Sequence, residues 1–198
     1  SMNNARKYLA GCGIQTSALA FGAGPTAVVK TELYNGTSWT EVADMAVAQK
    51  NHGGAGTTTA GLSCGGESPT NSRRVTQEWN ISANIITSDT WASGGNLGSS
   101  HYNRGGAGIQ TAALAFGGVP IIAKTEEYNG SSWSEQNDLG TGRQKLGGCG
   151  IQTAALAFGG LEPSRSDKTE EYNGTSWSEQ NNLSAATDSL AGAGTQTA

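Results

Sequence analysis

Apolar and small residues alternate along short segments of the chain. In the segment AALAFGG, Leu156 and Phe158 alternate with Ala155 and Ala157. A period of two places every second side chain on the same face, as in a β-strand. The unit around this segment predicts four strands in series, over residues 144–152, 154–160, 168–173 and 176–181. Short strands separated by glycine-rich turns predict an all-β protein.

The last two strands of this unit meet at Asn173-Gly174, which predicts a hairpin. A type I′ turn needs positive φ at both central residues, and Asn and Gly tolerate positive φ at low cost. The phrase YNGTSW stands at 34–39 and 172–177, and YNGSSW at 128–133. We expect these three segments to be hairpin tips. Because their aromatic residues recur at fixed places, we expect them to pack between neighbouring sheets.

The whole unit repeats along the chain. GIQTAALAFGG stands at 108–118 and 150–160, GIQTSALAFGA at 13–23 and GTTTAGLSCGG at 56–66, and GTQTA follows at 194–198. These copies begin at marker glycines 43, 52, 42 and 44 residues apart. The repeats therefore span about 7–49, 50–101, 102–143 and 144–186 of one domain over 1–198, and 187–198 begin a further repeat. The longer step is explained by about seven residues inserted within ISANIITSD, between the third and fourth strands of the second repeat.

The first strand of each repeat is unusually small. It reads AGCG at 10–13, GGAG at 53–56 and 105–108, and GGCG at 147–150. Small residues suit a place where several strands converge on one axis. Repeated four-stranded units with a small inner strand and aromatic outer strands predict a β-propeller of four-stranded antiparallel blades. The partial fifth repeat predicts an extra terminal inner strand.

The repeat resembles the kelch repeat. A glycine pair closes the second strand, Glu-Tyr-Asn follows about ten residues later, and a Trp stands five residues after the Tyr. The Tyr and Trp pairs are Tyr34 with Trp39, Tyr128 with Trp133, and Tyr172 with Trp177. The resemblance implies a propeller that serves mainly as an interaction module. It also extends to galactose oxidase-like and sialidase-like propellers, but the copper ligands of the former and the S-x-D-x-G-x-T-W boxes of the latter do not match.

Four repeats are few for a closed propeller. An extra inner strand would also leave backbone groups in need of a partner. Three arrangements are compatible with the repeats: a closed four-bladed ring with a displaced or exchanged terminal strand, a segment of a larger ring, or partial rings completed between chains as a homo-oligomer.

Composition excludes several classes of function. The net charge of −4 gives no general attraction to nucleic acid or to an anionic membrane, and no apolar stretch is long enough for a spanning helix. Three cysteines without a CxxC pair and two histidines do not predict a zinc site or a disulfide scaffold. We expect no metal site and no cofactor.

Two enzyme-like patterns have structural explanations. GLSCG at 61–65 matches the nucleophile elbow, but Ser63 falls within a predicted strand and no helix follows. The adjacent acids Glu126-Glu127 and Glu170-Glu171 resemble catalytic carboxylate pairs. Neighbouring residues of a strand point to opposite faces, so neither pair would share a substrate. We expect no catalytic residue.

The segments that differ between repeats are the better candidates for recognition. Loops between the second and third strands read GPTAVVK, ESPTNSRRV, VPIIAK and LEPSRSDK, and in a propeller they share a face with the connections between repeats. Seven residues ahead of the marker glycines, those connections carry Arg6, Gln49, His101 and Arg143. The candidate binding residues on this face are Arg6, Arg73, Arg74, His101, Arg143, Arg165 and Lys168.

The sequence thus predicts a non-catalytic binding module that recognises a protein or glycan through loops on one propeller face. The first alternative is a structural repeat segment of a larger assembly, such as a fibre or virion component. The second is a propeller enzyme of the glycosidase or oxidase type.

Overall fold

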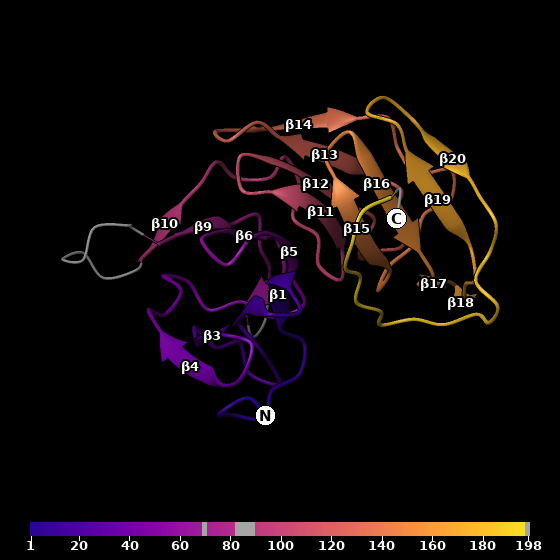
Figure 1. Cartoon of the computed structure of the whole chain (residues 1–198). Coiled ribbons are helices and arrows are strands. Elements are labelled where there is room, and N and C mark those ends of the chain that lie inside the picture. Colours follow the sequence, from indigo (N-terminus) through magenta and orange to yellow (C-terminus); the bar gives the residue numbers. More distant parts are fainter. Residues whose placement is uncertain (69–70, 82–89, 197–198) are drawn as a thin grey trace.

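A computed structural model describes residues 1–68, 71–81 and 90–196, and it confirms the all-β prediction. Four four-stranded antiparallel sheets form the blades of a four-bladed β-propeller (Figure 1). The blade strands are β1 (Ala10–Ile14), β2 (Ser17–Phe21), β3 (Thr31–Tyr34) and β4 (Trp39–Val42) in blade 1; β5 (Gly53–Gly56), β6 (Ala60–Cys64), β9 (Thr76–Asn80) and β10 (Thr90–Ser93) in blade 2; β11 (Gly105–Ile109), β12 (Ala112–Phe116), β13 (Thr125–Tyr128) and β14 (Trp133–Gln136) in blade 3; and β15 (Gly147–Ile151), β16 (Ala154–Phe158), β19 (Thr169–Tyr172) and β20 (Trp177–Glu179) in blade 4.

The first strand of each blade lies innermost. Strand β5 contacts both β1 and β11, and β11 contacts β15, so the four inner strands follow one another around a common centre. A Cβ on Gly54 would lie 3.0 Å from the carbonyl oxygen of Gly11, and one on Gly148 would lie 2.8 Å from that of Gly106. Neighbouring inner strands are therefore too close for larger side chains, which confirms the reason for their small residues.

The hairpin tips form as predicted, but their turn type differs from the prediction. Tyr172 pairs with Trp177, so four residues make the loop rather than two. Gly174 has a φ of +87°, whereas Asn173 is not among the described residues with positive φ. The Asn173 side chain instead accepts hydrogen bonds from the backbone N–H groups of Thr175 and Ser176, both at 2.9 Å. An Asx-type turn therefore replaces the expected type I′ turn.

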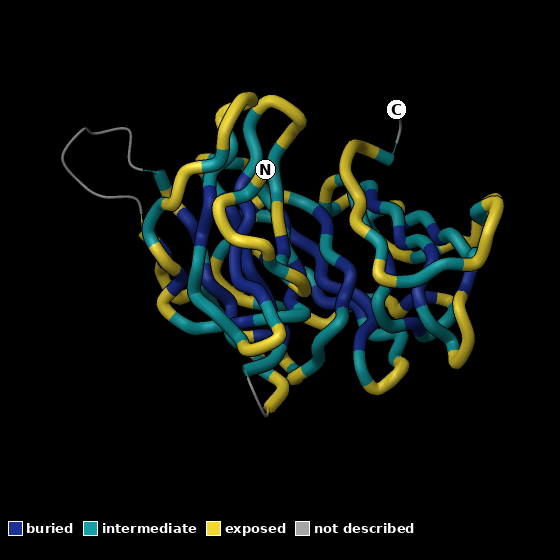
Figure 2. The backbone as a smooth tube through the Cα atoms, turned by 90° about the horizontal axis from the view of Figure 1, so that it is seen from below, coloured by how far each residue is buried: buried dark blue, intermediate teal, exposed yellow. Residues whose placement is uncertain are grey.

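The core lies between the blades (Figure 2). One cluster joins Phe116 of blade 3 to Tyr172 of blade 4, with Trp177 packed against it. A second cluster joins Phe21 of blade 1 to Trp91 of blade 2. The outer aromatic residues of one blade thus pack on the preceding blade, as the repeat predicts.

The ring is open between blade 1 and blade 4 (Figure 1). Residues 187–196 follow blade 4 and lie beside β15, in the place that a fifth inner strand would take. Gly150 N–H donates to the Gly194 carbonyl at 3.1 Å, and Ser189 N–H to the Lys145 carbonyl at 2.9 Å. A Cβ on Gly194 would have no neighbour among the described atoms within 4 Å, whereas one on the equivalent Gly150 would meet Ala154 in the second strand of blade 4.

Two loops between the second and third blade strands contain small two-stranded sheets that the sequence pattern did not predict. These sheets pair β7 (Glu67–Ser68) with β8 (Asn71–Ser72), and β17 (Leu161–Glu162) with β18 (Ser164–Arg165). The predicted insertion within residues 81–89 lies outside the described residues, apart from Ile81. The described part of the chain has no helix with the length and apolar character needed to cross a membrane.

Candidate functional site

The connections between blades and the loops after the second strands lie on one face, as predicted. Backbone bridges pair Lys7 with Gly24 and Gln144 with Leu161, and so bring the two kinds of segment together. We call this surface the loop face. It comprises residues 6–9, 49–52, 101–104, 143–146 and 187–190, together with the loops 22–30, 65–68, 71–75, 117–124 and 159–168.

Five residues with left-handed backbone conformation stand at equivalent places around the centre of this face. They lie five positions ahead of the marker glycines and have φ between 53° and 61°: Tyr8, Asn51, Asn103, Lys145 and Ser189. The N–H of each later residue donates to the carbonyl of the one before it, at 2.8 to 3.0 Å. Such backbone is disfavoured for residues other than glycine, so four consecutive hydrogen bonds hold a strained arc in place.

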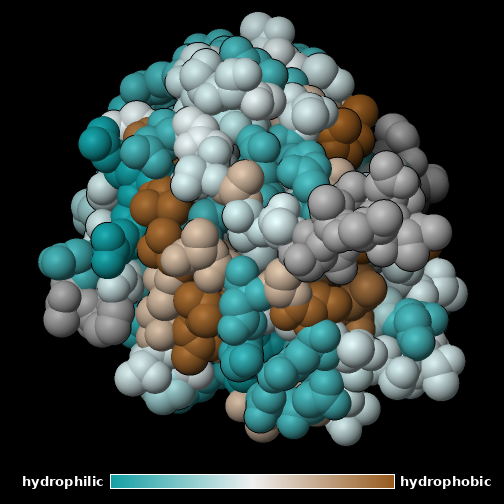
Figure 3. All heavy atoms as spheres, turned by 90° about the vertical axis from the view of Figure 1, so that its left-hand side faces the viewer, coloured by the Kyte–Doolittle hydropathy of each residue, from teal (hydrophilic) through white to brown (hydrophobic). Residues whose placement is uncertain are grey.

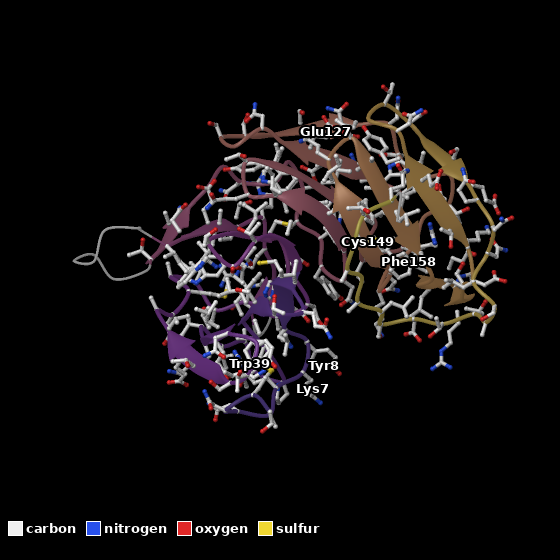
Figure 4. All side chains as sticks on the ribbon, viewed as in Figure 1. Lys7, Tyr8, Trp39, Glu127, Cys149 and Phe158 are labelled. Atoms are coloured by element: carbon white, nitrogen blue, oxygen red, sulfur yellow. The ribbon has the colours of Figure 1, made fainter. Side chains whose placement is uncertain are left out.

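The arc surrounds a hollow of about 570 Å³ at the centre of the loop face. The lining comes from all four blades and from the C-terminal segment: Lys7, Tyr8, Leu9, Asn51, His52, Asn103, Arg104, Lys145, Leu146, Ser189, Leu190 and Ala191. Figure 4 shows Lys7 and Tyr8 on blade 1, beside the open part of the ring. A concave surface with a few convergent polar groups has the general form of a ligand site.

The charged residues in the lining of the hollow are all basic. Its described lining contains no acidic residue. Arg104 is neutralised by Glu126 at 3.0 Å, but Lys7 and Lys145 have no ion pair within the described residues. The Lys7 ammonium lies 5.2 Å from the ring centroid of Tyr8, whose side chain is exposed. The lining of the hollow therefore contains two lysines without an ion pair in the described part of the chain, and one exposed aromatic ring.

His52 forms a buried part of the wall. It is only 6% exposed and packs against Phe21, with 5.7 Å between the ring centroids. Burial lowers its pKa from 6.5 to about 4, and the backbone carbonyls of Phe21 and Lys50 only partly oppose that effect. His52 is therefore neutral at neutral pH and adds no charge to the hollow.

Two of the predicted binding residues lie in the protein interior. Arg143 is fully buried and donates to Glu170 at 2.8 Å, and also to the carbonyls of Gly159 and Lys168. Arg6 makes the same contacts in blade 1, with Glu32 at 2.7 Å as its acid. These ion pairs link the entry of each blade to its second and third strands, so both arginines have structural partners.

The other two blades vary the same cluster. In blade 2, Gln49 and Gln77 replace the arginine and the acid, and their side-chain amides hydrogen-bond to each other. In blade 3, Arg104 supplies the guanidinium from three residues further along the chain, and donates to Glu126. Its predicted counterpart, His101, has Nδ1 3.0 Å from the Val119 carbonyl oxygen, and burial lowers its pKa.

The remaining candidates lie on the rims of two different blades. Arg73 and Arg74 belong to the loop of blade 2, and Arg74 donates to the Gly98 carbonyl at 3.4 Å. In blade 4, Arg165 is 70% exposed and pairs with Asp188 at 2.8 Å, while Lys168 pairs with Glu162 at 3.3 Å. The structure therefore separates the predicted cations into buried and rim positions.

The enzyme-like patterns have the structural surroundings that the sequence suggested. Ser63 is buried in β6 and donates to Gln49 Oε1 at 3.0 Å. Glu126 pairs with Arg104 inside blade 3, whereas Glu127 accepts a hydrogen bond from the Tyr172 hydroxyl of blade 4 at 3.1 Å. Within the described residues no three His, Cys, Asp or Glu side chains gather as a metal site would require.

Sequence reasoning missed the central residues of the hollow. The sequence feature that could have revealed them is the position five residues ahead of each marker glycine. Successive repeats carry Tyr, Asn, Asn, Lys and Ser there. The residue type at this position varies among the repeats, whereas the marker glycine is kept.

The chain is a four-bladed β-propeller with a hollow at the centre of its loop face. Neither the family models nor the curated proteins that were compared with this chain contain a match.

Proposed function

We propose that this chain is a non-catalytic binding module of the kelch-like type, and that its loop face takes an anionic group presented by a protein or glycan. The central observation in support is the hollow, which has Lys7 and Lys145 in its lining and no acid. Carboxylate or sulfate groups are the natural partners of two unpaired ammonium groups.

Three further features support binding rather than catalysis. The glycine pair, the Glu-Tyr-Asn segment and the spaced Trp resemble kelch repeats, which serve mainly as interaction modules. Asn51, Asn103 and Ser189 add neutral polar side chains to the lining, although Asn51 already donates to Glu67 and Ser189 to Asp188. The strained arc is held by backbone hydrogen bonds, so the site is preorganised and its binding requires little ordering.

A binding assay with two classes of probe tests this function. Calorimetric titration would use an oligoglutamate peptide, a sulfated oligosaccharide and a neutral oligosaccharide of the same length. We expect one anionic probe to bind, and its class to separate a protein partner from a glycan partner. High salt should abolish binding, because about 1 M salt shortens the screening length to about 3 Å.

Charge-removal variants locate the site. Lys7→Ala and Lys145→Ala should each weaken binding by up to about fivefold, which corresponds to about 1 kcal/mol for a partly exposed charge pair. Lys30→Ala is the matched control, because Lys30 is a partly exposed lysine outside the lining of the hollow. Equal effects of all three substitutions would contradict the central site, and unchanged affinity in Lys7→Ala and Lys145→Ala with loss in Arg73→Ala or Arg165→Ala would move the site to the rim.

A second candidate function is a structural segment of a larger assembly. The observation that favours it is the open ring, which leaves the outer faces of blade 1 and blade 4 without a neighbouring blade among the described residues. The two surfaces meet at residues 189–191, which line the hollow and belong to the segment that follows blade 4.

A further inference from the structure

Consecutive blades are joined by one repeated hydrogen bond. A Trp in the first two residues of the outermost strand donates from Nε1 to the Oγ1 of a Thr in the third strand of the preceding blade. The three pairs are Trp91 to Thr31 at 3.1 Å, Trp133 to Thr76 at 2.9 Å, and Trp177 to Thr125 at 3.0 Å. Each internal interface of the propeller therefore has the same donor and acceptor.

A second contact accompanies it. The Tyr128 hydroxyl donates to Glu78 at 2.5 Å, and the Tyr172 hydroxyl to Glu127 at 3.1 Å, in each case on the preceding blade. At the interface between blades 1 and 2, Leu33 stands at the position of the acid and Trp79 at the position of the Tyr. Leu33 packs against the apolar cluster that contains Trp79. Both members of the pair change together, so these two positions face each other at every interface.

Blade 4 carries the acceptor half of this interface without its donors. Thr169 Oγ1 is buried and has no hydrogen-bond partner in the described structure. Phe158 is only half-buried, whereas its counterparts Phe21 and Phe116 are fully buried beneath the Trp of the next blade. A buried hydroxyl without a partner is unfavourable, so this face is built to receive a donor.

Blade 1 carries the donor half. Tyr34 and Trp39 stack with 5.1 Å between ring centroids, and the internal pairs Tyr128–Trp133 and Tyr172–Trp177 stack at 5.0 Å. Trp39 Nε1 has no acceptor within the described residues, and the Tyr34 hydroxyl bonds only to Gly36 of its own hairpin. The two donors are thus already in the internal arrangement. Figure 4 shows Trp39 and Phe158 on the two blades that border the open part of the ring.

We propose that a second copy of this chain docks its blade 1 on the open face of blade 4, head to tail. Trp39 of the incoming copy donates to Thr169 and packs on Phe158, and its Tyr34 donates to Glu171. This contact continues the interface that already joins the internal blades, and one chain supplies both halves of it. Such a heterologous contact closes into a ring or extends, according to the rotation between copies.

The C-terminal segment competes with the incoming blade. Gln196 donates to the carbonyls of Ala155 and Tyr172, as Gln152 does to those of Ala113 and Tyr128 one blade earlier. Residues 187–196 therefore lie where β1 of the second copy must go, beside β15. Docking displaces this segment, so the segment is an internal cap on the assembly face.

Sedimentation equilibrium of the full chain tests the proposal between about 1 and 200 μM, where an interface of micromolar affinity is measurable. We expect concentration-dependent association of the wild-type chain. Trp39→Ala should weaken it at least tenfold, because the donor and the ring are both lost. Thr169→Arg should do the same by filling the acceptor face. Thr40→Arg is the matched control, since Thr40 is an exposed neighbour of Trp39, and it should associate like the wild type.

Mixing the two blocked variants gives the sharper result. Trp39→Ala retains its acceptor face and Thr169→Arg retains its donor face, so an equimolar mixture should form a complex of two copies and no larger one. Gly192→Val should strengthen association of an otherwise wild-type chain, because its side chain collides with Gly148 and loosens the cap.

Three results would overturn the proposal. A wild-type monomer at every concentration would mean that the face is covered within one chain or left bare. Mixed variants that associate no better than either alone would contradict the head-to-tail contact. Weaker or unchanged association of Gly192→Val would contradict the competition with the C-terminal segment.

Discussion

The buried ion pair of blade 4 provides a direct test of how the chain segment that enters a blade is held to that blade's strands. Arg143 and Glu170 are 2.8 Å apart, and their side chains are 0% and 4% exposed. Glu170 also accepts a hydrogen bond from the Gly140 N–H at 2.6 Å. Blade 2 holds Gln49 and Gln77 at the same two positions. Replacing Arg143 and Glu170 by glutamine therefore transfers an arrangement that the chain already uses.

The single and double substitutions should differ sharply. Arg143→Gln leaves a buried carboxylate without its counter-ion, and Glu170→Gln leaves a buried guanidinium. Removing one member of a buried ion pair costs about 3 to 5 kcal/mol of unfolding free energy. The double variant buries no charge and can pair its amides, so it should lie within about 2 kcal/mol of the wild type. The coupling energy should be at least about 4 kcal/mol.

Urea unfolding followed by tryptophan fluorescence measures these free energies. The exposed pair Lys124 and Glu135, whose side chains are 37% and 63% exposed, provides the control cycle. Its coupling should stay below about 1 kcal/mol. A double Arg143→Gln, Glu170→Gln variant that is destabilised by the sum of the two single changes would refute the reasoning, and so would two neutral single variants.

Three further predictions concern the core, pH and the centre of the ring. Trp133→Ala should lower the free energy of unfolding by about 3 to 5 kcal/mol, and Trp39→Ala by about 1 kcal/mol in the monomer, because it loses only the stack on Tyr34; equal effects in urea unfolding would contradict the packing account. The pKa of His52 is lowered from 6.5 to about 4, so the unfolded chain takes up the proton first and stability is lost as pH falls through that interval. His52→Leu introduces the residue that stands at the equivalent positions 9, 146 and 190. Between pH 7 and about pH 4, thermal unfolding should show that this variant loses about 3 kcal/mol less unfolding free energy than the wild type. An identical loss in both proteins would contradict the burial argument. Gly148→Ala should cost about 1 to 3 kcal/mol in urea unfolding, because its Cβ meets the Gly106 carbonyl at 2.8 Å, and an unchanged midpoint would mean that the inner strands are less closely packed than described.

Repetition made much of the fold predictable. Small residues such as Gly54 and Gly148, and aromatic residues such as Trp133, recur because every blade meets its neighbour in the same way. Their roles could be inferred from the spacing alone. The turn at Asn173-Gly174 was harder to predict, because the same two residues suit a two-residue type I′ turn and a four-residue loop capped by the Asn side chain.

The loop face was less predictable. Arg6 and Arg143 were expected at the surface because isolated charges are usually solvated, and only the paired change to Gln49 and Gln77 reveals that each arginine faces an acid. That signal becomes readable once the strand register is known. The free lysines of the hollow gave a weaker signal still, since Lys7 and Lys145 are not at equivalent positions of the repeat.

Proton exchange of the five tryptophan indoles would test the central claim most directly, which is that one Trp–Thr hydrogen bond joins each blade to the next. In a dilute sample, Nε1–H of Trp91, Trp133 and Trp177 should exchange slowly because each donates to a Thr, and Trp79 should do so because it donates to the Thr58 carbonyl at 2.9 Å. Trp39 should exchange fast, and should become protected as the concentration rises. Uniformly fast exchange of all five indoles, at any concentration, would contradict the account.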